Sequence, residues 1–202
     1  MVKPVELNLP LSVGDVRGLK AGDIVTLSGR IVTGRDRIHR YLAENRPAKE
    51  EIPFELSGAV LYHCGPVMEK SGDGYRAVSA GPTTSMRVEM YEAQIIREYD
   101  LRGIMGKGGM GEATRRALKE NGCVYLHTMG GAAVYLADRI RKVPGVWKLE
   151  EFGPTEAMWL FEVEGFPAIV TMDCQGNDIH GQVEEESFRR FSDLIKKVSS
   201  KS

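Results

Sequence analysis

The chain has 202 residues, of which 42% are apolar and 27% charged, the balance of an ordinary globular protein. This length suits one domain with a substantial core, so we predict a single domain over residues 1–202. The 27 basic and 28 acidic side chains leave a formal charge of −1, which offers no basic field and excludes nucleic acid as a partner.

The sequence lacks both kinds of membrane signal. No segment approaches the roughly 18 apolar residues of a membrane span, and the N-terminus has no basic-then-apolar leader. We therefore expect no membrane partner and a cytoplasmic location. The cysteines, Cys64, Cys123 and Cys174, are far apart, odd in number and set in or beside apolar runs. We expect buried, unreactive thiols, no disulfide framework, and neither an iron–sulfur cluster nor another metal held by this chain.

The first half of the chain reads as strands alternating with helices. β-branched or apolar runs predict strands at 5–9, 24–33, 58–64 and 76–80. Apolar spacing predicts helices or helical turns at 13–19, 38–42 and 84–99. The charged stretch 43–55, with its two prolines, should be an exposed connection, and 69–75 should be a hairpin loop.

The second half continues this alternation. Strands are predicted at 123–127, 146–149, 158–163 and 166–172. Helices are predicted at 113–121, from the double glycine 130–131 to Arg141, and at 185–198. Residues 103–111 should form a glycine-rich loop and residues 173–178 a polar turn. The last helix carries Phe188, Phe191, Leu194 and Ile195 on one face, and the tail after Val198 should fray. The whole pattern predicts an α/β fold with a mixed central sheet flanked by helices.

One stretch, Gly81-Pro82-Thr83-Thr84-Ser85-Met86-Arg87, reads as a turn that feeds directly into a helix. Thr83 or Thr84 can cap the first turn, and Arg87 projects from the same face. A helix N-terminus offers unpaired N–H donors, and a neighbouring guanidinium matches a carboxylate, so the stretch suits an anion. A plain helix cap with a solvated arginine is the alternative.

Other junctions between strand and helix present similar groups. Arg35 and Asp36 follow the strand 24–33, Lys107 lies among five glycines, and Gly130-Gly131 opens another helix. If these junctions share one edge of the sheet, three cations converge on a small anionic ligand, and three charges suit a dicarboxylate. The alternatives are a surface pair between Arg35 and an acid, a solvated Lys107, and close helix packing at the double glycine. His63, at the end of a central strand, is either a proton donor or ligand or, preferably, a hydrogen-bonded structural histidine.

Several motifs, in this order, resemble one family. They are Thr33-Gly34-Arg35-Asp36 with His39, Tyr62-His63-Cys64-Gly65-Pro66, Gly81-Pro82-Thr83-Thr84 with Arg87, Gly106-Lys107-Gly108, Gly130-Gly131-Ala132-Ala133, and Glu151-Phe152-Gly153-Pro154-Thr155-Glu156-Ala157. Together they resemble the β subunit, or C-terminal domain, of class I fumarate hydratases and of L(+)-tartrate dehydratases. The resemblance spans nearly the whole chain.

The resemblance implies a swivelling β/β/α domain and a reversible hydro-lyase. It also implies a [4Fe–4S] cluster held by three cysteines of a separate α subunit, which agrees with the dispersed cysteines here. This chain would then be one half of an enzyme that hydrates fumarate to malate, assembled as a heterotetramer or through a homodimer of this subunit.

The resemblance also implies roles for single residues. Thr83 would be the catalytic base, while Arg35, Arg87 and Lys107 hold the substrate carboxylates, with Gly81 and Thr84 beside them. A pocket drawn from the same motifs would include Asp36, His63, Gly130 and Gly131. A threonine hydroxyl is a weak base and needs an activating neighbour, which the sequence does not reveal and which a partner carboxylate could supply.

The substrate stays open at this stage. Ser85-Met86 departs from the Ala-Gly pair found in many fumarases, so a tartrate dehydratase β subunit is an alternative. A dicarboxylate-binding module without catalytic activity is a further alternative.

Overall fold

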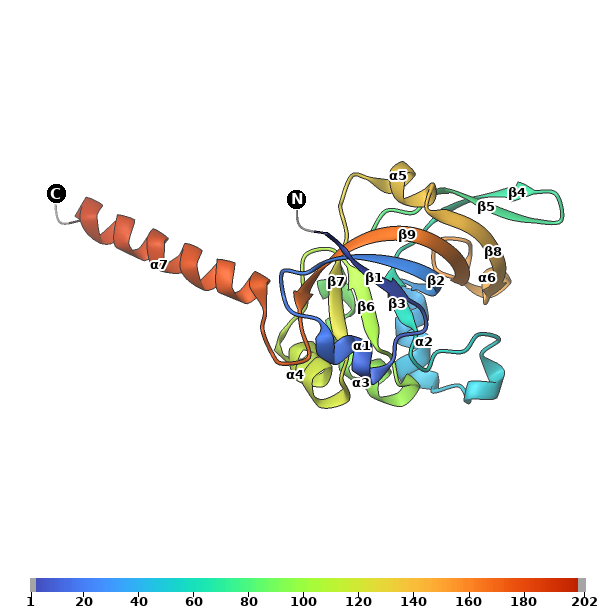
Figure 1. The fold of residues 1–202 in the computed structure, drawn as a ribbon, viewed down its shortest axis with the longest axis horizontal. Helices are drawn as coiled ribbons and strands as arrows, with labels where there is room; N and C mark the ends of the chain where they lie inside the picture. The colour runs from blue at the N-terminus through green and yellow to red at the C-terminus, as the bar shows by residue number, and fades with distance from the viewer. Residues whose placement is uncertain (1–2, 200–202) are drawn as a thin grey trace.

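The structure is a computed structural model that describes residues 3–199 (Figure 1). Its strands are β1 (Val5–Asn8), β2 (Ile24–Gly34), β3 (Val60–His63), β4 (Val67–Ser71), β5 (Gly74–Ser79), β6 (Gly103–Gly106), β7 (Val124–His127), β8 (Ile140–Trp147) and β9 (Met158–Met172). Its α-helices are α1 (Val13–Gly18), α2 (Asp36–Asn45), α3 (Glu89–Tyr99), α4 (Glu112–Asn121), α5 (Ala133–Ala137), α6 (Leu149–Phe152) and α7 (Ile179–Ser199). Two 3-10 helices, η1 (Lys49–Glu51) and η2 (Ser85–Val88), complete the set.

One seven-stranded sheet organises the molecule, in the order β1-β2-β3-β6-β7-β9-β8. Strands β1, β2, β3, β6 and β7 run parallel, whereas β9 pairs antiparallel with β7 and β8. The long strand β9 also pairs with β2, so the sheet folds back on itself. The mixed sheet with flanking helices confirms the predicted α/β class.

Two hydrophobic cores lie on opposite faces of the parallel strands. Val60 and Tyr62 of β3 belong to the core between the parallel strands and β9, whereas Leu61 belongs to the core beneath the helices. Helices α2, α3 and α4 cover this second face (Figure 1). Parallel strands buried on both faces explain the continuous apolar runs in the sequence. The layers are therefore β, β and α.

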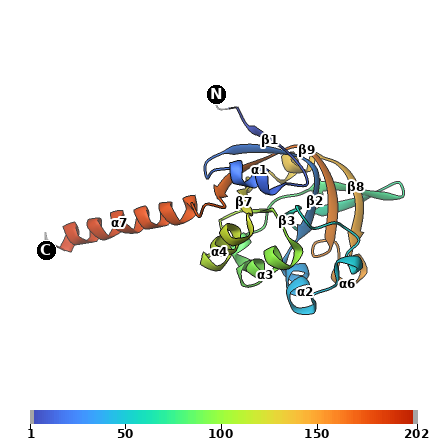
Figure 2. The ribbon, with the colours of Figure 1, turned by 60° about the horizontal axis from the view of Figure 1, so that its bottom comes forward.

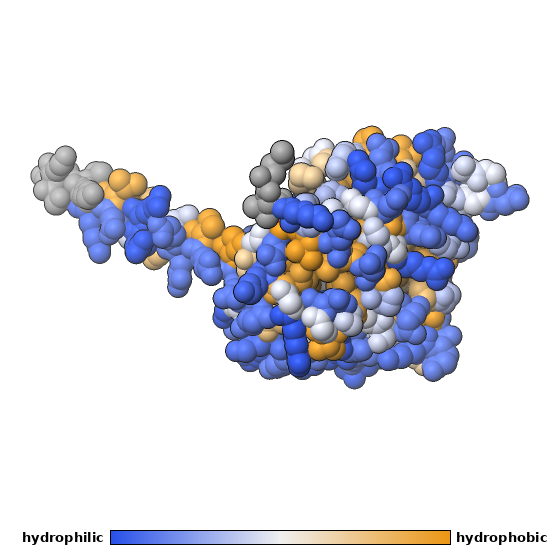
Figure 3. Space-filling model, in the orientation of Figure 1, coloured by the Kyte–Doolittle hydropathy of each residue, from blue (hydrophilic) through white to orange (hydrophobic). Residues whose placement is uncertain are grey.

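Helix α7 projects away from the body in both ribbon views (Figures 1 and 2). Its apolar side chains lie in the open, with Phe188, Phe191 and Leu194 exposed by 71%, 60% and 61%. Figure 3 shows hydrophobic and hydrophilic residues side by side along this helix. Among the helices of residues 3–199, none is both long and apolar enough to cross a bilayer.

Several predicted bounds are wrong for identifiable reasons. Residues 103–106, assigned to a glycine-rich loop, form β6, because Ile104 and Met105 fill the two cores between flanking glycines. The helix predicted to reach Arg141 ends at Ala137, and β8 begins at Ile140. Two separate strands predicted over 158–172 are the single strand β9, which crosses Gly165 without ending.

Three more segments differ in extent. The stretch 69–75 is largely strand, with only a tight turn between β4 and β5. The connection 43–55 contains the end of α2 and the 3-10 helix η1. The last helix begins at Ile179 rather than at residue 185, and the tail predicted to fray lies mainly outside the described residues.

Candidate active site

The site residues predicted from the sequence follow the carboxyl ends of neighbouring parallel strands. Gly34, the last residue of β2, pairs with His63 of β3, and Gly106 of β6 pairs with His127 of β7. Arg35, Cys64, Lys107 and Thr128 therefore begin their loops at one edge of the sheet. Ligands of open α/β sheets bind at this kind of edge.

The segment carrying Thr83 is joined to two of these strand ends. Pro82 forms an antiparallel bridge with Cys64, and Thr84 forms a parallel bridge with Lys107. The Thr83 N–H donates to the His63 carbonyl at 2.7 Å, and the Lys107 N–H donates to the Thr83 carbonyl at 3.3 Å. These main-chain bonds fix Thr83 and Lys107 side by side, although the two residues are far apart in sequence.

The arginines form a second group at this edge. Asp36 Oδ2 accepts a hydrogen bond from Arg87 and lies 3.8 Å from the Arg35 guanidinium. On its other side, Arg35 Nε lies 3.3 Å from Glu156 Oε1. The expected pair between Arg35 and a neighbouring acid is therefore present, but Glu156 is the nearer partner. Both arginine charges are partly compensated by carboxylates.

Lys107 and Thr83 differ from the arginines in this respect. Within residues 3–199, neither the Lys107 ammonium nor the Thr83 hydroxyl has a hydrogen-bond or ion-pair partner. Both side chains are half-buried. A half-buried cation without a carboxylate next to it is available for an anionic ligand. Among the described residues, no side chain forms a hydrogen bond that could activate the Thr83 hydroxyl.

The prediction of a helix capped by Thr83 or Thr84 is wrong. The chain enters the 3-10 helix η2 first, and α3 starts only at Glu89. Thr84 occupies the N-cap position, but among the described residues its side chain accepts no capping hydrogen bond. The N–H groups of Thr83 and Ser85 donate to the carbonyls of His63 and Lys107. These donors are consumed by the fold, so the cations rather than the helix end must attract an anion.

The predicted glycines also lie at this edge. A Cβ on Gly130 would meet Lys107 Cδ at 3.5 Å, which places the lysine stem beside the glycine. A Cβ on Gly81 would lie 2.9 Å from that of Ala133, so Gly81 permits close packing of α5. Gly131 has a positive φ of 84° and open space around it, which identifies a turn rather than a close approach.

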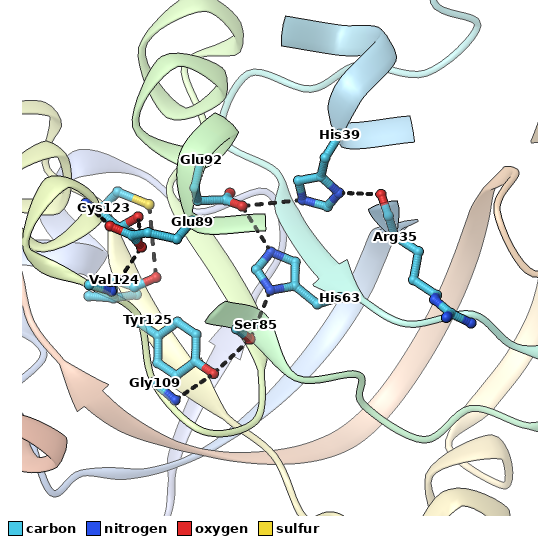
Figure 4. A network of polar contacts seen from close by, with 12 residues as sticks. Arg35, His39, His63, Ser85, Glu89, Glu92, Gly109, Cys123, Val124 and Tyr125 are labelled. Carbon is cyan, nitrogen blue, oxygen red and sulfur yellow. Dashed lines mark hydrogen bonds and ion pairs between the residues drawn. The ribbon is translucent and has the colours of Figure 1, made fainter. Parts of the chain in front are cut away.

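His63 does not line an open pocket. It is completely buried, and its Nδ1 lies 2.9 Å from the Ser85 hydroxyl. Its Nε2 lies 3.2 Å from the buried carboxylate of Glu92 (Figure 4). The preferred interpretation, a hydrogen-bonded structural histidine, is confirmed by these contacts.

Glu92 and His39 form the deeper part of this arrangement. Both are fully buried, and His39 Nε2 lies 3.2 Å from Glu92 Oε2 (Figure 4). Burial alone would lower the pKa of His39, but the Glu92 carboxylate raises it above the ordinary value. Burial lowers the pKa of His63 although Glu92 opposes this effect, and a lowered pKa favours the neutral ring. Burial would raise the pKa of Glu92, yet the two imidazoles bring it to about 2.

The cysteines do not fit an iron–sulfur cluster. Cys64 belongs to the core between the two β layers, Cys123 to the core beneath the helices, and Cys174 donates to the Val16 carbonyl. Burial raises the pKa of Cys64 and of Cys123, which favours the unreactive thiol over the thiolate that binds iron. Among the residues described, no cysteine joins a group of three candidate ligands.

Sequence reasoning missed two acids of this region. Glu156 contacts Arg35 and also accepts the Arg37 N–H, and it lies inside the motif 151–157. In the sequence, Glu92 looks like an ordinary charged residue of a helix. Its complete burial could be predicted only if the two histidines that contact it were known. An arginine that follows a strand end is a signal for a nearby acid, but the sequence does not say which one.

One hollow of the molecule lies away from this edge. A hollow of about 550 Å³ lies between α4 and the start of α7, lined by residues that include Arg115, Asn177 and Phe188. It contains none of the predicted site residues. The exposed apolar residues Met86, Met129 and Val134 are close in sequence to the predicted site residues Thr84 and Gly130 and to Ala133.

Comparisons with known proteins give consistent matches. The family model described as "Fumarase C-terminus" matches residues 1–183. A protein of Geobacillus stearothermophilus with the provisional name class I fumarate hydratase is 46% identical over 197 residues, covering 97% of this chain but 37% of that protein.

Two relatives are matched over almost their whole length. One, from Methanocaldococcus jannaschii and provisionally named L(+)-tartrate dehydratase subunit beta, is 40% identical over 92% of this chain and 95% of its own. The L(+)-tartrate dehydratase subunit beta of Escherichia coli K12 is 33% identical over 95% of this chain and 94% of its own length. The chain thus spans about a third of one relative and nearly all of the others. All these names denote hydro-lyases.

Proposed function

Because this chain belongs to the fumarase C-terminus family, we propose that it is the β subunit of a class I fumarate hydratase, which reversibly hydrates fumarate to (S)-malate. The observation that carries the proposal is the meeting of Arg35, Thr83 and Lys107 at one carboxyl edge of the parallel strands. A fumarate hydratase must hold two carboxylates, and this edge offers three cations when Arg87 is included.

In this proposal each residue has a distinct task. Lys107, which lacks a carboxylate neighbour among the described residues, binds one substrate carboxylate directly. Arg35 and Arg87 bind the other and are kept in place by Asp36 and Glu156. Cations placed where negative charge develops lower the barrier to removing a proton beside a carboxylate.

Thr83 is the proposed base at the reacting carbon. In the direction from malate to fumarate, its Oγ would take the proton from the C–H bond next to a carboxylate. The electron pair of that bond would form the C=C bond, and the hydroxyl on the adjacent carbon would leave as hydroxide. A hydroxyl needs activation for this step, and residues 3–199 supply none next to it. We therefore expect an activating group from the partner subunit.

The proposal includes a cluster-bearing α subunit. Two relatives are named subunit beta, which implies a partner for those proteins. We expect the [4Fe–4S] cluster on the corresponding partner here, since the cysteines of this chain do not form its ligand set within the described residues. The exposed Met86, Met129 and Val134 suit a surface that a partner covers.

A second candidate is the β subunit of an L(+)-tartrate dehydratase. It is favoured by two relatives of that name whose length matches this chain almost completely. Tartrate carries a second hydroxyl but has the same two carboxylates, so the cations described above serve either substrate.

The test is anaerobic reconstitution with the cluster-binding α subunit. We expect no turnover from this chain alone, and turnover of fumarate, in preference to tartrate, from the reconstituted pair. Preference for tartrate would select the second candidate. Steady hydration of fumarate by the chain alone would contradict the division into two subunits, and a reconstituted pair inactive on both diacids would contradict the proposed activity.

A further inference from the structure

A buried charge cluster lies directly behind the site. Glu92, His39 and His63 are all fully buried, and Glu92 Oε2 is 3.2 Å from Nε2 of each imidazole (Figure 4). Placing a carboxylate and two imidazoles in a core costs several kcal/mol unless their charges and hydrogen bonds are matched. Such a cluster needs a reason beyond packing.

The contacts define the protonation of His39. Its Nδ1 lies 2.7 Å from the Arg35 carbonyl, which can only accept, so Nδ1 carries a proton. Its Nε2 lies 3.2 Å from the Glu92 carboxylate, an ion-pair distance without hydrogen-bond geometry. The nearby buried carboxylate raises the pKa of His39, so we infer an imidazolium that balances the charge of Glu92.

The contacts of His63 give the opposite result. Its Nε2 lies 3.2 Å from Glu92, so we infer that Nε2 carries the proton and that Nδ1 accepts from the Ser85 hydroxyl at 2.9 Å. Ser85 Oγ in turn accepts from the Tyr125 hydroxyl at 2.9 Å, and Tyr125 accepts from the Gly109 N–H at 3.3 Å. Donors and acceptors alternate along this line from the Gly109 N–H to the His63 ring, and a 3.2 Å contact without hydrogen-bond geometry joins His63 Nε2 to Glu92 on α3.

Each end of this line reaches the main chain of a site loop. His39 contacts the Arg35 carbonyl, and His63 accepts the Thr83 N–H with its own carbonyl. Ser85 donates its N–H to the Lys107 carbonyl. One buried carboxylate thereby connects, through two histidines, the three loops that carry Arg35, Thr83 and Lys107.

A bound metal explains the cluster less well. Two imidazoles and a carboxylate resemble a metal ligand set, but structural zinc takes four protein ligands. Among residues 3–199 no fourth histidine, cysteine or acid joins this group. At 3.2 Å from Glu92 Oε2, the positive charge inferred on His39 balances the carboxylate without a further cation.

We propose that Glu92 is a positioning residue, which acts through His39 and His63 to hold the main chain of the Arg35, Thr83 and Lys107 loops in register. The contribution of Glu92 to turnover rests on the proposed function, whereas its effect on the positions of the loops is independent of that function. Small displacements of reacting groups reduce turnover more than binding, because long cationic side chains can still reach a carboxylate.

The first test is Glu92→Gln, compared with Glu98→Gln on the same helix, where Glu98 pairs with Arg46 at the surface. A glutamine offers one acceptor and places an NH2 group near imidazole donors, so one histidine contact is lost. In the full chain, we expect amide hydrogen exchange at Thr83, Lys107 and Gly109 about ten-fold or more faster in Glu92→Gln only.

The same variants in the pair with the α subunit separate turnover from binding. We expect Glu92→Gln to lower kcat about ten-fold or more with KM changed less than about three-fold, and Glu98→Gln to change neither. If the wild-type pair is inactive on both diacids, the proposed function fails while the exchange result still decides the role of Glu92.

Two milder variants can still be measured if Glu92→Gln does not fold. Ser85→Ala and Tyr125→Phe remove single hydroxyls from the line and keep the carboxylate paired. We expect each variant to speed amide hydrogen exchange at Gly109 and Lys107. In the wild type, we expect the ring N–H signals to show His39 protonated on both nitrogens and His63 protonated at Nε2. Unchanged exchange in all three variants would overturn the proposal. So would stoichiometric zinc in the wild type that is lost in Glu92→Gln.

Discussion

Charge compensation distinguishes Lys107 from the arginines around it. Arg35 and Arg87 share the Asp36 carboxylate, and Arg35 also contacts Glu156. Lys107 has no acid partner in the part of the chain that is described, and it is half-buried beside Gly130. Removing Lys107 should therefore affect ligand binding more than it affects folding.

We predict that Lys107→Met raises KM for the diacid in the reconstituted pair by about ten-fold to a hundred-fold. A hydrogen bond to a charged group contributes about 1.5 to 3 kcal/mol, which corresponds to this range. Steady-state kinetics measure the effect, with Lys119→Met on the exposed face of α4 as the matched control. A KM equal to that of the control would remove Lys107 from the substrate site.

The charge on His39 gives a prediction about pH. Although burial opposes it, Glu92 holds the pKa of His39 above the ordinary value of 6.5. The folded protein thus binds this proton more tightly than the unfolded chain does. The resulting stability is complete below about pH 6.5 and is lost as pH rises through the raised folded pKa.

We therefore expect the free energy of unfolding of His39→Gln to approach that of the wild type as pH increases. The loss of the contact to the Arg35 carbonyl leaves a constant difference at all pH values. Denaturant unfolding from about pH 5.5 to about pH 9 measures both effects. A difference that does not vary with pH would show that His39 is neutral.

At the scale of elements, the site is made by loops that follow the parallel strands β2, β3 and β6, together with the segment after β5 that carries Thr83. The ends of β2, β3 and β6 are adjacent because these strands pair in register, as Gly34 with His63 and Tyr62 with Met105 show. Gly106, the last residue of β6, lies where this arrangement is tightest. A Cβ there would collide with Ser85 Oγ and lie 3.1 Å from His63 Nδ1.

We predict that Gly106→Ala lowers the free energy of unfolding by about 1 to 3 kcal/mol, since both neighbours are fully buried and cannot yield. Thermal or denaturant unfolding gives the value. Gly18→Ala is the control, because a Cβ at Gly18 meets nothing within 4 Å and its φ is not positive. Equal free energies of unfolding of the two variants would show that the site loops shift to accommodate the added Cβ at little cost.

The same elements show what the sequence could reveal. The β2 and β3 strands and the α4 helix were predictable, because their apolar residues follow simple periods and Gly122 ends α4 in the left-handed conformation. The lack of a capping hydrogen bond at Thr84 was not predictable, because the N–H groups of Thr83 and Ser85 bond to strand ends far away in sequence. Tertiary contacts of this kind leave no local pattern.

The residues of the site show the same division. Arg35, Thr83 and Lys107 could be placed on loops from glycine and cation patterns. The meeting of Arg35 and Lys107 follows from the parallel pairing of β2, β3 and β6, whereas Thr83 reaches them through main-chain bonds to His63 and Lys107. Glu92 and Glu156 could not be assigned, because their partners come from other elements. The roles proposed for Thr83 and the cations remain predictions.

At the scale of the whole molecule, the β, β and α layers bury two cores without help from α7. That helix extends from the body, and its residues from 184 onward lie beyond the region that matches the family model. The contacts of its first turn, such as His180 Nε2 with Thr171 Oγ1 at 3.0 Å, lie before this point.

We predict that a chain ending at Val183 unfolds with a free energy within about 1 kcal/mol of the full chain, because the removed side chains that are described bury little surface. Denaturant unfolding of the two chains measures this difference. A loss of several kcal/mol would show that α7 packs on the body or on a second copy in solution.

The central claim is that one edge of this chain supplies both the base and the cations of a diacid site. The most direct measurement is turnover of fumarate and of tartrate by Thr83→Ala paired with the α subunit under anaerobic conditions. The account predicts a pair that assembles like the wild type and has no measurable turnover of either substrate. Turnover close to that of the wild-type pair would contradict it.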